Sequence, residues 1–143
     1  MLGFSNTTGY AVQALCCLAS CNLEKNSTSA IAKCSKVPRP YLCKIINLLT
    51  RKGLVVSRRG IGGGIKLARP ADKITLFEIV LAIEGDKWAT DCLLGYSWCK
   101  NEQCCPTHPF WGETKEKIKQ ELSRWTLADV VKYAQKQKSA ESK

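Results

Sequence analysis

Two absences narrow the class of protein that these 143 residues encode. The longest apolar stretch, over residues 10–21, is interrupted by Gln13 and Ser20 and is too short to span a bilayer. The first residues place no basic segment ahead of an apolar one, so a secretory signal is not expected. These absences predict a cytoplasmic protein with no membrane partner.

Acidic residues are scarce in the first half of the chain. Residues 1–73 hold twelve Lys and Arg against only Glu24 and Asp72, which gives 12 − 2 = +10. Residues 74–143 hold ten basic and ten acidic residues, so their net charge is zero. A module that binds a polyanion, joined to a neutral module, is the economical interpretation. The alternative is a basic protein without such a partner.

Apolar spacing and capping residues predict three helices at the start, over about residues 10–21, 27–33 and 38–52, with Thr7 or Thr8 capping the first. The third helix has a buried stripe at three- and four-residue steps, formed by Leu42, Ile45, Ile46 and Leu49. Its other face is mostly basic or polar. Two helices joined by a short turn, the second with a basic outer face, match a helix-turn-helix.

A β-hairpin is expected next, because the apolar runs 54–58 and 65–68 flank a glycine-rich loop. A hairpin directly after a recognition helix is the wing of a winged helix. The glycine run lacks the Gly-Lys-Ser/Thr ending of a phosphate loop, so no nucleotide site is expected. The helix and the wing together supply the predicted DNA contacts: Arg39, Tyr41, Cys43, Lys44, Arg51, Arg58 and Arg59.

The second half contains a segment without helical period, residues 86–109, between two helical regions. A capping box at Thr75 and Glu78 begins the helix before it, and Pro109 opens the helix after it. That later helix carries a seam-like stripe with no evident partner in the remaining chain: Trp111, Lys115, Ile118, Leu122 and Trp125. A last helix is expected over about 126–137.

The segment 86–109 holds the only histidine and a cluster of cysteines. Cys92, Cys99, Cys105 and His108 lie within seventeen residues, enough soft ligands for one metal centre. Gaps of six and five residues between the cysteines exceed those of a zinc knuckle and favour an iron–sulfur cluster slightly over zinc. The other cysteines have plainer predicted roles. Cys16, Cys17, Cys21 and Cys34 are expected to be small buried hydrophobes, Cys43 an incidental contact and Cys104 spare. The four tryptophans are expected only to pack and shield this half.

Several motifs in order resemble the IscR/NsrR family of bacterial winged-helix transcription regulators, the Rrf-two superfamily. They are Gly9-Tyr-Ala-Val-x-Ala-Leu15, Val37-Pro-x-x-Tyr-Leu42, Leu54-Val-x-Ser-x-Arg-Gly60 with Gly62-Gly-Gly64, Ile74-Thr-Leu76, Glu84-Gly85 and Thr126-Leu-Ala-Asp129. The resemblance implies a homodimer, held by the long helix after the loop, on a roughly palindromic DNA operator. It divides the chain into a DNA-binding domain (1–85), a cluster-binding loop (86–109) and a dimerisation helix with a C-terminal helix (110–143).

The resemblance also implies the cofactor. Cys105, the three-residue step to His108 and the following Trp111 look most like the IscR branch, which holds a 2Fe–2S cluster on three Cys and one His. A 2Fe–2S cluster is therefore favoured over 4Fe–4S. Two departures matter. The gap between Cys92 and Cys99 is six residues, whereas that branch usually has five. In NsrR-like members a carboxylate just before the first helix completes the cluster, whereas here no acidic residue occurs before Glu24.

The leading interpretation is a cluster-containing regulator that senses redox, iron or cluster status, is not an enzyme and takes no small-molecule substrate. One alternative is a zinc-stabilised DNA-binding protein, and another is a thiol-switch regulator acting through Cys43 or the loop. A redox enzyme or electron carrier is disfavoured, because the chain has no Cys-x-x-Cys motif.

Overall fold

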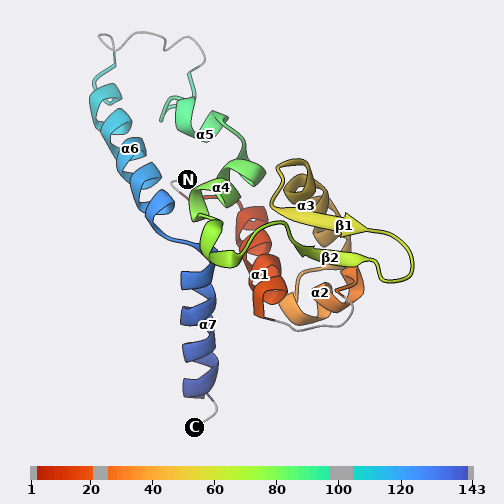
Figure 1. Ribbon diagram of the computed structural model, residues 1–143. Helices are drawn as coiled ribbons and strands as arrows, with labels where there is room; N and C mark the ends of the chain where they lie inside the picture. The colour runs from red at the N-terminus through yellow and green to blue at the C-terminus, as the bar shows by residue number, and fades with distance from the viewer. Residues whose placement is uncertain (1–2, 21–25, 97–104, 142–143) are drawn as a thin grey trace.

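The computed structural model describes residues 3–20, 26–96 and 105–141, and its architecture is mainly helical with one two-stranded hairpin (Figure 1). This confirms the predicted fold class. Cys21, Cys99 and Cys104 lie outside the described residues. The elements, in chain order, are α1 (Asn6–Ser20), α2 (Thr28–Ser35), α3 (Arg39–Arg51), β1 (Val55–Arg58), β2 (Gly64–Leu67), the 3-10 turn η1 (Ala71–Lys73), α4 (Leu76–Glu84), α5 (Lys87–Thr90), α6 (His108–Arg124) and α7 (Leu127–Glu141).

Helices α2 and α3 form the expected helix-turn-helix. The Ser27 side chain caps α2 by accepting a hydrogen bond of 3.1 Å from the Ala30 amide. Lys36 adopts the left-handed conformation (φ 57°) that ends α2 and turns the chain into α3. All four predicted stripe residues of α3 are buried, so this helix is fixed by one face and presents the other to solvent.

The predicted wing is the antiparallel hairpin β1–β2, in which Val55 pairs with Leu67 and Arg58 with Gly64. Its tip requires glycine at residue 63, because an added Cβ there would collide with the carbonyl oxygen of Arg58. The Gly63 amide instead donates to the Gly60 carbonyl at 3.0 Å and closes the turn. Beyond the ends of the two strands, the tip projects from the molecule as a loop (Figure 1).

The start of α1 differs from the prediction. The helix begins at Asn6, and Thr8 lies inside it with 6% of its surface exposed, so neither Thr7 nor Thr8 is the cap. Glu84, the last residue of α4, is the reason. Its Oε1 accepts hydrogen bonds from the Ser5 amide at 2.8 Å, the Ser5 hydroxyl at 2.6 Å and the Thr8 hydroxyl at 2.5 Å. A carboxylate at a helix N-terminus satisfies donors that have no partner within the helix.

The last helix packs against the DNA-binding unit. The Leu127 amide donates to the Ile74 carbonyl at 2.8 Å, and the Leu76 amide donates to the Trp125 carbonyl at 2.9 Å. Leu127 is fully buried in the core formed by α1, α3 and α4, and α7 contacts both α1 and η1. The C-terminal helix therefore shares the core of the winged helix, and the predicted division at residues 85 and 109 stays a prediction.

Helix α6 lies beside α4 and α5, on the side of the molecule away from the hairpin (Figure 1). Helix α4 is thus a partner for part of the α6 stripe, which the sequence did not reveal. No residue of α6 is fully buried, however, and Trp125 remains 46% exposed. The apolar stripe is only partly covered within one chain.

Candidate DNA interface and metal site

The outer face of α3 is exposed and positively charged. Arg39, Cys43, Lys44, Asn47 and Arg51 are all exposed, as the helical period predicted. Tyr41 is 54% exposed, and its ring centre lies 6.2 Å from that of Tyr10 in α1. The first turn of α3 thus presents to solvent the Arg39 cation and the Tyr41 ring, one side of which lies near Tyr10.

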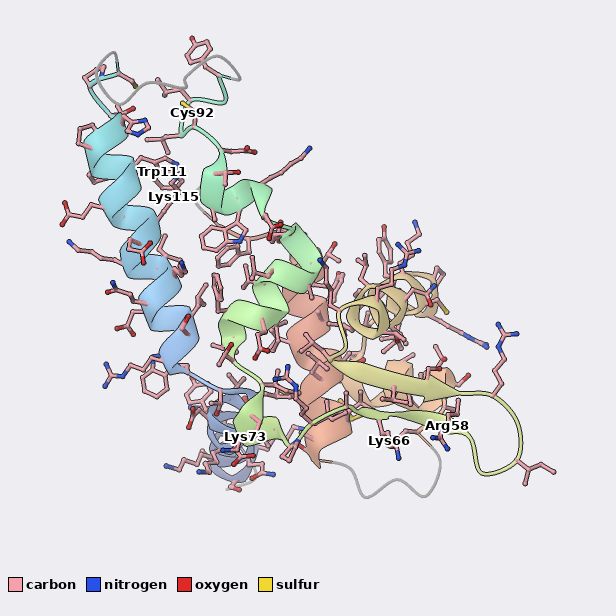
Figure 2. All side chains as sticks on the ribbon, turned by 45° about the horizontal axis from the view of Figure 1, so that its top comes forward. Arg58, Lys66, Lys73, Cys92, Trp111 and Lys115 are labelled. Atoms are coloured by element: carbon pink, nitrogen blue, oxygen red, sulfur yellow. A yellow bond between two sulfur atoms is a disulfide. The ribbon has the colours of Figure 1, made fainter. Side chains whose placement is uncertain are left out.

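A groove of about 580 Å³ separates this helix from the wing. Cys43 and Asn47 line it from α3, Arg58 and Arg59 line it from the wing, and the start of α2 closes one end. Figure 2 shows Arg58 and Lys66 on the hairpin. A groove bordered by a basic helix and a basic wing matches the surface that grips a DNA backbone in winged-helix proteins.

The predicted DNA-contacting cations are available to bind phosphates, because no carboxylate in the described structure neutralises them. Among the described residues, none of Arg39, Lys44, Arg51, Arg58 and Arg59 forms an ion pair with a carboxylate. Arg69 is different, because its Nη2 lies 2.6 Å from Glu78 Oε1. Unpaired surface cations leave the positive potential of this face uncompensated.

The sequence did not single out two further residues at this surface. Asn26, at the entry to α2, accepts a hydrogen bond of 2.9 Å from the Ile65 amide and so joins the helix-turn-helix to the wing. The contact is between backbone atoms of distant residues, and no side-chain pattern announces it. Ile61 is fully exposed at the wing tip. The sequence signal that could have indicated this exposure is that Ile61 is an apolar residue flanked by glycines.

A second site lies at the start of α6, where Cys92, Cys105 and His108 line one small cavity of about 40 Å³. Thr107, Trp111 and Lys115 complete this side of it, and Figure 2 shows Cys92, Trp111 and Lys115 at the same end of the molecule. Three of the four predicted ligands are thereby brought together. Within the described ranges no three His, Cys, Asp or Glu side chains are close enough to hold a metal ion, and Cys99 lies outside those ranges.

Hydrogen bonds favour the thiolate form of Cys105, the form that binds metals. Its sulfur lies 3.1 Å from the Thr107 hydroxyl. This hydroxyl, with the backbone amides of Thr107 and His108, holds the pKa of the Cys105 thiol below its usual value, although burial and the Cys92 thiol act in the opposite direction. Two thiols and an imidazole around one cavity are three of the four donors that an iron–sulfur cluster of the three-Cys, one-His kind requires.

Trp111 and Lys115 hold the segment that leads into Cys92. Trp111 Nε1 donates to the Asp91 carbonyl at 3.0 Å, and Lys115 Nζ donates to the same oxygen at 3.4 Å. The Lys115 ammonium also lies 5.8 Å from the centre of the Trp111 ring. The prediction that the tryptophans only pack is therefore incomplete, since Trp111 fixes the residue before a candidate ligand. Its position three residues after His108 was the signal that the sequence offered.

Aromatic rings connect this region to the N-terminus. The Trp88 ring in α5 lies 5.4 Å from Phe4, edge to face, and 6.3 Å from Phe77 in α4. Together with the Glu84 carboxylate, these contacts join the segment that precedes the cysteines to the start of α1.

The prediction that Cys17 and Cys34 are merely buried hydrophobes is wrong. They form a disulfide that links α1 to α2, with Cα atoms 6.2 Å apart, and both residues are partly exposed. Cys16, beside Cys17, remains a free thiol, and burial raises its pKa, although the positive charge of Lys138 opposes the effect. The apolar residues around Cys17 on α1 suggested a packing role, whereas its disulfide with Cys34 depends on how α1 and α2 cross, which the sequence does not show.

The described helices include none that is both long and apolar enough to cross a membrane. Residues 4–133 match the model of the Rrf2 family, described as an iron-dependent transcriptional regulator. The chain belongs to the Rrf2 family. This Rrf2 protein is a DNA-binding transcriptional regulator and not an enzyme.

Individual relatives agree with this assignment. An HTH-type transcriptional regulator of Aquifex aeolicus is 35% identical over 136 residues, which cover 93% of this chain and 94% of the relative. IscR of Erwinia tasmaniensis is 36% identical over 91 residues, covering 64% of this chain and 54% of that one. The structure of T. potens IscR matches with a TM-score of 0.73 and 31% identity, covering 93% of this Rrf2 protein and 88% of T. potens IscR. The structure of CymR, the global cysteine regulator of B. subtilis, matches with a TM-score of 0.72 and 26% identity, covering 93% of this Rrf2 protein and 98% of CymR.

Proposed function

We propose that this protein is a cytoplasmic, homodimeric regulator whose affinity for a pseudo-palindromic operator depends on an iron–sulfur cluster. The observation that carries the proposal is the convergence of Cys92, Cys105 and His108 on one cavity at the start of α6. Cys99 completes the ligand set, and a 2Fe–2S cluster is favoured. The similarity to IscR in sequence and in structure supports this choice.

On DNA, the exposed face of α3 lies in the major groove. Arg39, Tyr41, Cys43 and Lys44 face the base edges there, while Arg51 lies near the backbone. Arg58 and Arg59 reach the minor groove or its phosphates from the wing. Because none of these cations is paired with a carboxylate in the described structure, each is available to replace a counterion of the DNA.

The dimer forms through α6. This helix runs for 17 residues without a fully buried side chain, and its stripe of Ile118, Leu122 and Trp125 is covered by α4 only in part. Pairing the stripe with that of a second copy removes the remaining apolar surface from water. A two-fold dimer then presents two recognition helices to half-sites about one helical turn, or a multiple of it, apart.

The cluster would supply a centre whose charge and ligation change with redox state and iron supply. The protein contributes three functions of its own. Thr107 favours the thiolate of Cys105, Trp111 and Lys115 fix the backbone ahead of Cys92, and His108 offers an imidazole nitrogen as a ligand. A change in the packing of the segment ahead of Cys92 is then transmitted to α1 through the contact of Trp88 with Phe4 and that of Glu84 with Thr8. Only a free-energy difference between the two states changes operator affinity.

The test compares cluster-loaded and cluster-free protein, prepared anaerobically, on one operator fragment at one salt concentration. We expect a difference in Kd of about 5-fold or more, the lower end of ordinary allosteric coupling. Cys92→Ser should abolish the difference, whereas Cys16→Ser, at a free cysteine of α1 outside both the loop and the DNA-contacting face, should retain it. Equal affinities at every operator tried would contradict the proposal. A colourless protein that contains zinc would favour the zinc-stabilised alternative.

A further inference from the structure

We propose that Cys17 and Cys34 form a reversible dithiol–disulfide site in the DNA-binding half, oxidised by low-molecular-weight disulfides and separate from the cysteines of residues 92–105. The Cα atoms of the two residues are 6.2 Å apart, within the ordinary range for a bridge. A spacing in this range lets the bond form and break without a large movement of either helix.

The surroundings indicate a reversible bond and not a structural one. Both cysteines are partly exposed, so a small thiol or disulfide reaches them. Helices α1 and α2 are held together by a buried cluster that includes Leu15, Leu18 and Ile31, and this packing does not need a crosslink. Disulfides of cytoplasmic proteins are generally transient and serve catalysis or redox sensing, and this step of the argument rests on the proposed location.

The neighbouring charges make Cys34 the better candidate for the first attack, and geometry selects Cys17 over Cys16 as its partner. Lys33 precedes Cys34 and Lys36 follows it two positions later, and nearby positive charge favours a thiolate. Cys16 is a free thiol whose pKa is raised by burial. Adjacent positions on a helix point about 100° apart, so only Cys17 of the two faces α2.

The reaction is a balanced thiol–disulfide exchange. The Cys34 thiolate attacks one sulfur of a small disulfide RSSR, forms a mixed disulfide and releases RS⁻, which takes up the proton lost by Cys34. The Cys17 thiolate then attacks the Cys34 sulfur of the mixed disulfide and releases the second RS⁻, which takes up the proton lost by Cys17. The protein loses two protons and two electrons, and RSSR becomes two RSH. Excess dithiol reverses both steps.

The crosslink acts at the joint of the helix-turn-helix. Cys34 lies in the last turn of α2, two residues before the left-handed Lys36 that directs the chain into α3. Oxidation therefore ties this joint to α1 and closes a loop of chain between residues 17 and 34. A loop of this length restricts the unfolded chain enough to raise the melting temperature by roughly 5–10 °C.

The experiment exposes the full-length protein to oxidised glutathione, blocks the remaining thiols with iodoacetamide and maps tryptic fragments by mass spectrometry. We expect fragment 1–25 joined to fragment 34–36, and separation of the two by dithiothreitol. Cys16→Ser, the matched control on the same turn of α1, should retain the joined pair. Cys34→Ser should lose it, and Cys17→Ser should lose it and instead carry glutathione on Cys34.

A joined pair that persists in Cys17→Ser, or its absence from the oxidised wild type, would overturn the proposal. A second measurement needs no variant: the wild-type melting temperature should rise on oxidation and return with dithiothreitol. An unchanged melting temperature in protein shown to be crosslinked would remove the proposed constraint on the joint. The iron content is read separately, so failure of this site and failure of the cluster proposal are distinguishable.

Discussion

Glu84 offers the sharpest test of how the end of α4 is joined to the start of α1. Its carboxylate, at the end of α4, accepts two hydrogen bonds from Ser5 and one from Thr8 at the start of α1. Glu84→Gln keeps the shape and one oxygen acceptor but removes the negative charge. The substitution therefore isolates the charge from the packing.

The expected loss follows from the number and exposure of these bonds. A hydrogen bond to a charged group contributes about 1.5–3 kcal/mol when buried, and Glu84 is only partly buried, so solvent weakens each of the three. Because glutamine retains part of the interaction, we expect Glu84→Gln to lower the free energy of unfolding by about 1 kcal/mol. For a chain of this length that lowers the melting temperature by roughly 2–4 °C.

The pH dependence identifies the carboxylate as the cause. Burial alone would raise the pKa of Glu84, but the hydrogen bonds from Ser5 and Thr8 outweigh it and hold the pKa below the usual value. A group whose pKa is lowered by folding stabilises the folded state above its unfolded pKa of about 4.3. The difference between wild type and variant should therefore be complete at pH 7 and disappear as the pH falls through the lowered folded pKa.

Thermal denaturation monitored by circular dichroism, repeated between pH 3 and pH 7, measures this difference. Glu113→Gln is the matched control, because within the described part of the chain Glu113 pairs only with Lys117, 2.8 Å away on the exposed face of α6. It should leave the melting temperature unchanged at pH 7. If Glu84→Gln melts with the wild type at pH 7, or if the difference persists unchanged at pH 3, the inferred junction is wrong.

Three further predictions concern the DNA interface, the core and the metal site. Arg58→Gln should reduce the slope of log K for DNA binding against log salt by about 1.8 for a dimer, and should weaken DNA binding roughly 60-fold at 0.1 M salt. Arg69→Gln is the control and should leave both values unchanged, because Arg69 is already paired with a carboxylate. Fluorescence anisotropy across salt concentrations measures both variants. Leu42→Ala, at a fully buried position, should cost about 2–5 kcal/mol in urea denaturation. Trp111→Phe keeps the ring but loses the hydrogen bond ahead of Cys92, so the visible absorbance of reconstituted protein should decay several-fold faster than in Trp125→Phe.

The DNA-binding half was predictable because its signals are local. The α3 stripe follows the helical period, and the Thr75–Glu78 capping box forms as the sequence indicated, with the Glu78 amide 3.2 Å from the Thr75 hydroxyl. The turn glycines likewise mark the wing. In each case a few adjacent residues determine the structure, and the pattern is visible in one window of sequence.

The features that the sequence did not reveal depend on contacts between distant residues. Glu84 gives α1 an earlier start than its own residues indicate, from 79 positions away. The crossing of α1 and α2, and not any spacing pattern, pairs Cys17 with Cys34. Leu127 joins the core of the winged helix only because the chain returns after α6. Periodicity and capping rules describe neighbours along the chain and carry no information about such contacts.

The cysteine site could be predicted from the sequence only in part. Composition and spacing brought Cys92, Cys105 and His108 together as a set, and the structure places these three around one cavity. The supporting contacts from Trp111 and Lys115 to the Asp91 carbonyl could not be predicted, because they require α6 to lie against the segment before the cysteines.

The most direct test of cluster binding is the metal and sulfide content of protein purified without oxygen, measured together with its visible absorption spectrum. We expect about two iron ions and two acid-labile sulfides per chain, with visible absorbance that is lost in Cys92→Ser. A colourless protein that contains zinc, or one without metal that still discriminates its operator, would contradict cluster-dependent regulation.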